Sequence, residues 1–198
     1  HKTLVVDIHH DEHPPYAMRY VAAAATQIAE AGLADPVVLV GHSGAGPLLP
    51  QIGYARRSAH HAVGGYVFFD ASLPRPGSPT RLELLHTEDH SFAHDLTALL
   101  DAGGRFPDWD DEALLALARP RGKDFFTERL PHPPDWPDAP VAYVRTSGPY
   151  AWHARVARGR SWPVVERELG HFPGITYPTA AADAVEEALR DLPGLPAT

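Results

Sequence analysis

The residues best suited to covalent chemistry in this sequence form a glycine-rich hexapeptide, 41–46, which reads Gly-His-Ser-Gly-Ala-Gly. An apolar run, 37–40, precedes it and a helix-forming stretch follows it. A Gly-X-Ser-X-Gly pattern between a strand and a helix forms a tight, strained turn that exposes the serine beside a helix N-terminus. Alanine is a small substitute at the last place of the pattern. The hexapeptide therefore predicts Ser43 as a nucleophile, because a turn that only caps a helix would not explain a serine at the strained position.

A serine nucleophile needs a general base, and His171 stands in the place that the element order favours. The segment 163–168 is predicted to be the last strand, and the Gly170-His171 turn follows it. A histidine after the final strand of such a sheet returns its imidazole to the side of the nucleophile. We therefore predict His171 as the base. The other histidines are expected in loops or on helix faces, and His42 is expected to pack beside the serine turn.

The carboxylate that would orient the imidazole has two possible positions in this order. One follows the predicted strand 141–144, where residues 145–150 contain no Asp or Glu. The other is the end of the strand 66–69, where Asp70 stands. A buried acid is costly without a partner, and a neighbouring imidazole would supply one. We predict Asp70 as the orienting acid; the alternative is that it caps the turn at Ala71 and Ser72.

Stabilisation of an oxyanion needs two hydrogen-bond donors. The backbone N–H of Gly44, directly after the nucleophile, is predicted to be one of them. The second usually comes from a loop after an earlier strand, and the chain opens at His1 with what looks like the strand after that loop. Two alternatives follow. Either residues that carry the donor precede His1, or turnover is impaired.

These residues must be positioned by alternating strands and helices. Apolar, β-branched runs predict strands at 4–8, 37–40, 66–69, 141–144 and 163–168, and helical spacing predicts helices at 16–31, 47–61, 150–159 and 179–191. The alternation predicts an α/β fold with a mostly parallel sheet and helices on both faces. Residues 76–138 contain helical stretches, 81–102 and 110–118, between Pro-rich loops. We expect a core of residues 1–75 and 139–198, with 76–138 inserted as a helical cap.

Composition excludes several classes of function. A net charge of -8 argues against a nucleic-acid surface, and no apolar run approaches the roughly 20 residues of a membrane span. The absence of cysteine rules out disulfides, thiolate metal sites and cysteine nucleophiles. The compartment stays open on this evidence, with the cytoplasm as the default expectation.

The hexapeptide, Asp70 and the Gly-His turn together resemble the α/β-hydrolase fold superfamily, in particular its small bacterial esterase-like branch, which is similar to plant methyl-esterases and hydroxynitrile lyases. The likeness spans most of residues 4–192, without the first strands of that fold. It implies an eight-stranded, mostly parallel sheet, a helical cap and a Ser-His-Asp triad formed by Ser43, His171 and Asp70. It also implies cofactor-free hydrolysis of a small ester or thioester through an acyl-enzyme.

Two other functions remain open at this point. A protein of the same fold could bind a small molecule without turnover, or act as a lyase, because a shared fold does not fix the chemistry. A metal-binding protein would use the cluster 9–13 or the histidines 86, 90 and 94, which would share a face of one helix. The aromatic residues of 76–138 either line an apolar pocket or join the cap to the core; they are Phe92, Phe106, Trp109, Phe125, Phe126 and Trp136.

Overall fold

The centre of the molecule is a sheet of four parallel strands in the order β1 (Val37–Ser43), β2 (Val63–Ala71), β3 (Val141–Arg145) and β4 (Val164–Glu166). The computed structural model describes residues 1–8, 12–110 and 112–193. The two central strands are apolar and buried on both faces, as expected of a parallel sheet covered by helices. Because the strands are parallel, the carboxyl ends of β1 and β2, which carry Ser43 and Asp70, meet at one edge.

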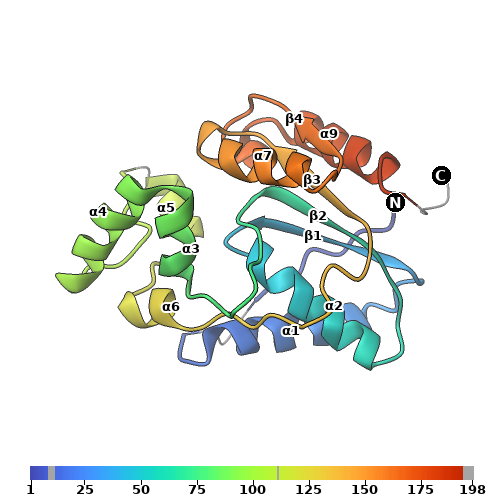
Figure 1. The fold of residues 1–198 in the computed structure, drawn as a ribbon, viewed down its shortest axis with the longest axis horizontal. Coiled ribbons are helices and arrows are strands. Elements are labelled where there is room, and N and C mark those ends of the chain that lie inside the picture. Colours follow the sequence, from blue (N-terminus) through green and yellow to red (C-terminus); the bar gives the residue numbers. More distant parts are fainter. Residues whose placement is uncertain (9–11, 111, 194–198) are drawn as a thin grey trace.

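Helices cover both faces of this sheet (Figure 1). Alternate residues of β2 and β3 pack against α1 (Tyr16–Glu30), α2 (Leu49–Ser58) and α7 (Ala151–Gly159) on one face. The intervening residues pack against α9 (Pro178–Arg190) on the other. Two short 3-10 helices, η1 (Gly46–Leu48) and η2 (Gly148–Tyr150), lead into α2 and α7. The predicted α/β class, the parallel sheet and the helices on both faces are thus confirmed.

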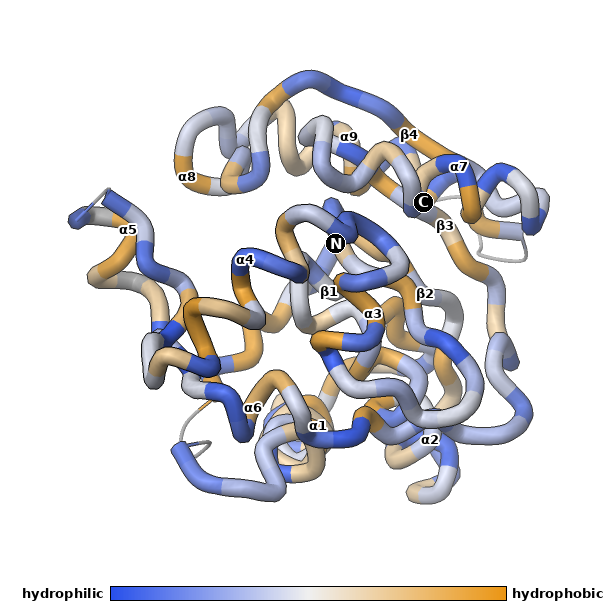
Figure 2. Tube along the Cα trace, turned by 60° about the vertical axis from the view of Figure 1, so that its left-hand side comes forward, coloured by the Kyte–Doolittle hydropathy of each residue, from blue (hydrophilic) through white to orange (hydrophobic). Residues whose placement is uncertain are grey.

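Four helices lie between β2 and β3 in the sequence: α3 (Arg81–Glu88), α4 (His90–Asp101), α5 (Glu112–Leu117) and α6 (Lys123–Thr127). Figure 1 shows them grouped beside the strands, and the trace of this group in Figure 2 alternates between hydrophilic and hydrophobic residues. Their apolar residues form a small core of their own around Leu96, Leu100 and Phe126. The division of the chain into a core and a cap stays a prediction.

The single helix expected over 81–102 was wrong, because two helices occupy this stretch. The side chain of Asp89 accepts a hydrogen bond from the backbone N–H of Phe92, which is the geometry of a helix N-cap. Asp89 has an extended backbone with φ −146°. Such a residue cannot continue α3, so the chain ends one helix there and begins the next. The structure also adds α6 and a short helix, α8 (Pro173–Thr176), which the sequence analysis did not predict.

The strand expected at 4–8 was wrong as well. This segment has no regular secondary structure and belongs to no sheet, and the side chain of Val5 is 90% exposed. Its backbone is held by α1 instead, because the N–H and carbonyl of Asp7 both bond the side-chain amide of Gln27. A run of β-branched residues forms a strand only where a neighbouring strand pairs with its backbone. None of the described strands pairs with this segment.

The described helices are also too short or too polar to pass through a lipid bilayer.

Candidate active site

Ser43 is the last residue of β1 and has a left-handed backbone, with φ 54°. Such a conformation is strained for any residue with a side chain and is often found at functional sites. The turn that follows is closed by a bond of 3.0 Å from the N–H of Ala45 to the carbonyl of His42. The predicted sharp turn between strand and helix is therefore present, with η1 and α2 directly after it.

Two glycines of the hexapeptide are required by close packing. A Cβ atom at Gly46 would lie 2.2 Å from the carbonyl oxygen of Ser72, and one at Gly41 would lie 2.9 Å from the side chain of Leu49. A Cβ atom at Gly44 would meet nothing within 4 Å. The small residues thus let β1 and η1 approach their neighbours, while the space beside Gly44 is open.

His171 lies in the turn after β4, as the sequence predicts. The N–H groups of Leu169 and Gly170 each donate to the carbonyl of Thr146 at 3.0 Å, which fixes the start of this turn beside the end of β3. Gly170 has φ 81°, a conformation that glycine adopts at no steric cost. The turn places Nε2 of His171 3.0 Å from Oγ of Ser43.

Asp70 lies in β2 next to its last residue, is fully buried and also has a left-handed backbone, with φ 42°. Its Oδ2 accepts from Nδ1 of His171 at 2.7 Å and from the hydroxyl of Ser147 at 2.6 Å. Its Oδ1 accepts from the N–H groups of Thr146 and Ser147 at 2.8 and 3.0 Å. The structure therefore brings Ser43, His171 and Asp70 together in one hydrogen-bonded line. The carboxylate does not cap its own turn, because its backbone donors lie beyond β3.

The charge of Asp70 is stabilised where it lies. Burial alone would raise the pKa of this carboxyl, but the bonds from His171, from the hydroxyl of Ser147 and from two backbone N–H groups outweigh it and hold the pKa below its ordinary value. A carboxylate accepts and cannot donate, so Nδ1 of His171 carries a proton. In the neutral imidazole, Nε2 is then free to accept the proton of Ser43.

His42 does more than pack beside the turn. Its Nε2 donates to the backbone carbonyl of His171 at 2.8 Å, and its ring lies 4.6 Å from the His171 ring. Burial, followed by the charge of His171, lowers the pKa of His42. His42 therefore ties the serine turn to the histidine turn as a neutral ring.

Tyr150 is the residue of this site that the sequence analysis missed. Its hydroxyl oxygen lies 3.3 Å from Oγ of Ser43, and its ring stacks on that of His171 with centroids 4.9 Å apart and planes 10° apart. Burial raises the pKa of Tyr150 to about 12. In the sequence, the segment 145–150 is notable only because it contains no Asp or Glu. No local pattern in it predicts that Tyr150 contacts the nucleophile.

The three histidines proposed as metal ligands do not form a metal-binding group, although the rings of His86 and His90 lie 5.6 Å apart. His86 belongs to α3, whereas His90 and His94 belong to α4, so the shared helix face is absent. Within the part of the chain that the structure describes, no three His, Asp or Glu side chains are grouped as metal ligands would be. Part of the other cluster, 9–11, lies outside the described residues.

The aromatic residues of 76–138 divide between two places. Trp109 packs edge-on against Phe172, the residue after His171, with centroids 5.2 Å apart. Phe106 contacts Phe92, Trp109 and Phe126 in a continuous aromatic group. Trp136 lies elsewhere, in the core against Tyr66, Phe68 and Trp162.

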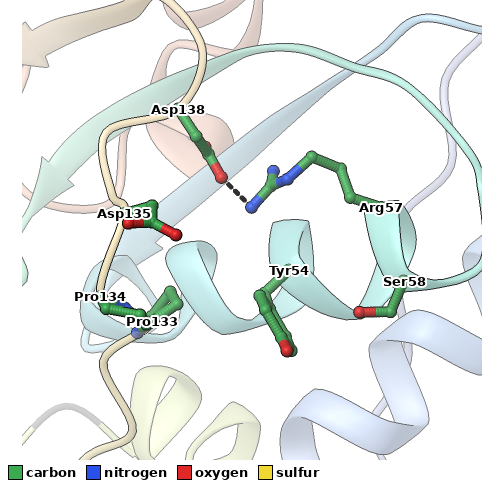
Figure 3. A pocket seen from close by; sticks show the side chains of 7 residues that line it. All are labelled: Tyr54, Arg57, Ser58, Pro133, Pro134, Asp135 and Asp138. Atoms are coloured by element: carbon green, nitrogen blue, oxygen red, sulfur yellow. Dashed lines mark ion pairs between the residues drawn. The ribbon is translucent and has the colours of Figure 1, made fainter.

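A hollow of about 300 Å³ lies between the C-terminal half of α2 and the segment 133–138 and has no part in this arrangement. Figure 3 shows its walls, where Tyr54, Arg57 and Ser58 of α2 face the segment 133–138 and Arg57 pairs with Asp138. None of its lining residues belongs to the Ser43 site.

Comparisons with known proteins agree with this architecture. The model of the alpha/beta hydrolase family matches residues 1–184. A sequence search of curated proteins finds no match. Among solved structures, an extracellular alpha/beta-hydrolase from a Paenibacillus species superposes with a TM-score of 0.66 at 19% identity, over 87% of this chain and 79% of that one. Its structure is described as sharing structural and functional homology with tobacco Salicylic Acid Binding Protein 2.

Two further solved structures are more distant. The Vlm2 thioesterase domain has a TM-score of 0.47 at 17% identity, over 89% of this chain and 76% of that one. Tomato Methylketone Synthase I has a TM-score of 0.49 at 15% identity, over 85% and 78%. Both superpose too loosely to inform the fold.

Proposed function

Because the chain belongs to the alpha/beta hydrolase family, we propose that it is a serine hydrolase that cleaves a small ester or thioester through an acyl-enzyme on Ser43. One observation carries the proposal. The oxygen of Ser43 lies 3.0 Å from Nε2 of His171, whose Nδ1 lies 2.7 Å from the buried carboxylate of Asp70. This is the relation of nucleophile, base and orienting acid on which acyl transfer by serine depends.

The mechanism follows from the proton positions in this line. Nε2 of His171 takes the proton of Ser43 while Oγ attacks the substrate carbonyl carbon. The N–H of Gly44 donates to the oxyanion, and Asp70 holds the proton on Nδ1 and stabilises the imidazolium. The tetrahedral intermediate collapses, the bond to the leaving alcohol or thiol breaks, and His171 returns its proton to that group.

Water then releases the acid by the same steps. His171 removes a proton from the water, the hydroxide oxygen attacks the acyl carbon, and the bond to Oγ breaks as His171 protonates Ser43. Every proton is accounted for by the side chains present, and the proposed reaction requires neither a cofactor nor a metal.

We propose a small molecule with an apolar acyl group as the substrate. Phe172 packs edge-on against the ring of His171, with centroids 4.8 Å apart, and Trp109 packs edge-on against Phe172. An apolar wall of this kind suits an aliphatic or aromatic group beside the nucleophile. From the net charge of -8 and the sequence expectations, we also propose that the partner is neither a nucleic acid nor a membrane surface and that the protein is cytoplasmic.

The test is the intact mass of the protein after treatment with a fluorophosphonate, which modifies only activated serines. We expect one adduct on the parent protein and none on Ser43→Ala. A second variant, Ser72→Ala, is a matched control, because Ser72 lies near the site but its hydroxyl bonds Glu88. No adduct on the folded parent would contradict a working nucleophile and favour a protein that binds its ligand without turnover. An adduct that persists in Ser43→Ala would place the nucleophile elsewhere.

A further inference from the structure

The hydroxyl of Tyr150 has no role in the mechanism above, although it lies 3.3 Å from the nucleophilic oxygen. We infer that Tyr150 is a catalytic residue and that its hydroxyl is the second donor to the oxyanion, beside the N–H of Gly44. The inference rests on the proposed function of Ser43.

The direction of the bond between Tyr150 and Ser43 follows from the rest of the line. The carboxylate of Asp70 fixes the proton of His171 on Nδ1, so Nε2 accepts the proton of Ser43. The hydroxyl of Ser43 has only one proton to give. Its oxygen is therefore the acceptor toward Tyr150, and the tyrosine O–H points at the atom that attacks the substrate.

The position of this donor is fixed by rings on two sides. The ring of Tyr150 stacks on His171 and also packs against His153, with centroids 5.7 Å apart and planes 30° apart. His153 is itself 1% exposed and belongs to α7, which begins directly after Tyr150. An oxyanion donor acts through such pre-organisation, because it need not reorient when charge develops.

The segment 146–150 contacts both the acid and the nucleophile of this site. Thr146 and Ser147 bind Asp70, and η2, directly after them, ends at Tyr150. A segment with no acid of its own therefore positions the acid of β2 and places a hydroxyl on the nucleophile.

Tyr150 keeps its proton over the range in which the reaction would run. Burial, with smaller contributions from the charges of Asp70 and Glu88, raises its pKa to about 12, although the bond to Ser43 acts in the other direction. The side chain is thus a neutral donor at neutral pH, where an ionised phenolate would repel an oxyanion.

The hydroxyl of Tyr150 can exchange its hydrogen bond to Ser43 for one to the oxyanion without transferring its proton. When Oγ forms its bond to the carbonyl carbon, it ceases to be a good acceptor, and the new negative charge appears on the oxygen attached to that carbon. An oxyanion donor works at about 2.7–3.1 Å from that oxygen. Tyr150 approaches the nucleophile closely enough to make this shift, and its O–H bond stays intact throughout.

The test is Tyr150→Phe, which keeps the ring stack and removes one oxygen atom. Within the described residues the hydroxyl bonds only Ser43, so its loss leaves no buried group without a partner. For hydrolysis of p-nitrophenyl butyrate we expect kcat to fall by roughly 100-fold or more, with little change in KM, as for the loss of one oxyanion donor. Tyr54→Phe is the matched control, because Tyr54 is 49% exposed on α2, and its activity should equal that of the parent.

A second readout separates a donor from a residue that only shapes the pocket. Trifluoromethyl propyl ketone forms an anionic adduct with an activated serine, whereas methyl propyl ketone resembles the ground state. In Tyr150→Phe we expect the affinity for the first ketone to fall by about the same factor as kcat, and that for the second to stay within about twofold. Equal losses for both ketones would overturn the inference in favour of a packing role. Parental kcat in the variant would overturn it as well.

Failure of the proposed function has a different signature. If the folded parent neither reacts with the fluorophosphonate nor hydrolyses the ester, the proposed roles of both Ser43 and Tyr150 are contradicted. If the parent reacts and Tyr150→Phe behaves like the parent in every assay, only the role of Tyr150 falls.

Discussion

At the scale of single residues, Ser43 and Asp70 share an unusual property. Both have left-handed backbones, and both lie at the carboxyl ends of neighbouring strands. Each such residue costs on the order of 1–3 kcal/mol and persists only where its surroundings enforce it. For Asp70 the surroundings include Tyr143, whose buried hydroxyl donates to the carbonyl of Ala71 at 2.8 Å and accepts from its N–H at 3.2 Å. The strand bends at Asp70, and the tyrosine satisfies the backbone groups that this bend releases.

Replacement of Asp70 by Asn should lower kcat by about 10,000-fold and leave the fold intact. The Asn oxygen can still accept from the N–H groups of Thr146 and Ser147, but its amide must then donate to Nδ1 of His171. The imidazole proton moves to Nε2, which can no longer accept from Ser43. Steady-state kinetics and a circular dichroism spectrum check both parts. A rate within about tenfold of the parent would remove Asp70 from the catalytic line.

His42 makes the stability of the fold depend on pH. Its pKa in the folded protein lies below the ordinary value of 6.5, so the unfolded chain binds the proton more readily. The neutral ring makes its full contribution to the free energy of unfolding above pH 6.5. This contribution is lost as the pH falls from 6.5 to the pKa of the folded protein. We expect the thermal midpoint of the parent to fall between about pH 7.5 and pH 5.5 by more than that of His42→Gln, whose amide can still donate to the carbonyl of His171. If the thermal midpoints of the two proteins changed equally with pH, His42 would not be the source of the pH dependence.

At the scale of elements, the sequence predicts a strand correctly where a neighbouring strand pairs with its backbone. β1, β2, β3 and β4 lie where apolar runs predict them, since each pairs with another strand. The segment 4–8 has the same composition but lacks such a neighbour, and composition alone cannot show this. A single side chain also decided the boundary between α3 and α4. Asp89 has helical residues on both sides; its extended backbone ends α3, and its side-chain bond to the N–H of Phe92 begins α4.

The candidate site divides in the same way between predictable and unpredictable residues. Ser43, His171 and Asp70 occupy positions that the order of strands makes distinctive. Tyr150 and His42 could not be assigned, because their contacts depend on how the turns after β1, β3 and β4 meet. The sequence pattern also predicts only part of the need for glycine. The tightest contact in the hexapeptide is at Gly46, which lies against the carbonyl oxygen of Ser72.

That approach gives a prediction at the level of the turn. A methyl group at Gly46 would overlap the carbonyl oxygen of Ser72, and this carbonyl cannot easily retreat because the N–H of Leu73, in the same peptide group, bonds Nδ1 of His153 at 3.4 Å. Gly46→Ala should lower the free energy of unfolding by about 1–3 kcal/mol, the usual cost of overpacking. Gly44→Ala is the control and should change it little, since its methyl group meets open space. Urea unfolding of both variants measures the difference, and equal midpoints would contradict it.

At the scale of the whole molecule, one buried group joins the helices α3–α6 to the sheet. The carboxylate of Glu88, at the end of α3, accepts from the hydroxyl of Ser72 at 3.0 Å and from Nε2 of His153 at 3.1 Å. Ser72 follows β2, and His153 belongs to α7. Because the side chains of Glu88 and His153 are 7% and 2% exposed, water screens this link little.

Glu88→Ala should therefore lower the free energy of unfolding by about 1.5–3 kcal/mol, the range for a hydrogen bond to a charged group. It should also speed hydrogen exchange in α3 more than in α9. The control is Lys123→Ala, which breaks the exposed ion pair with Asp101 and should change stability by less than about 1 kcal/mol. Uniform exchange rates in α3 and α9 of Glu88→Ala would show that this carboxylate does not hold the helical group.

The hydrogen bonds of Asp70 also set the time at which the site can exist during synthesis on the ribosome. The partners of this carboxylate lie 76, 77 and 101 residues further along the chain. At the usual rates of translation, His171 is added roughly 5 to 20 seconds after Asp70. Until then the nascent chain holds a serine turn without a base and an acid without its donors. Under the proposed function, Ser43 therefore cannot be activated before His171 has been added to the chain and has folded beside it.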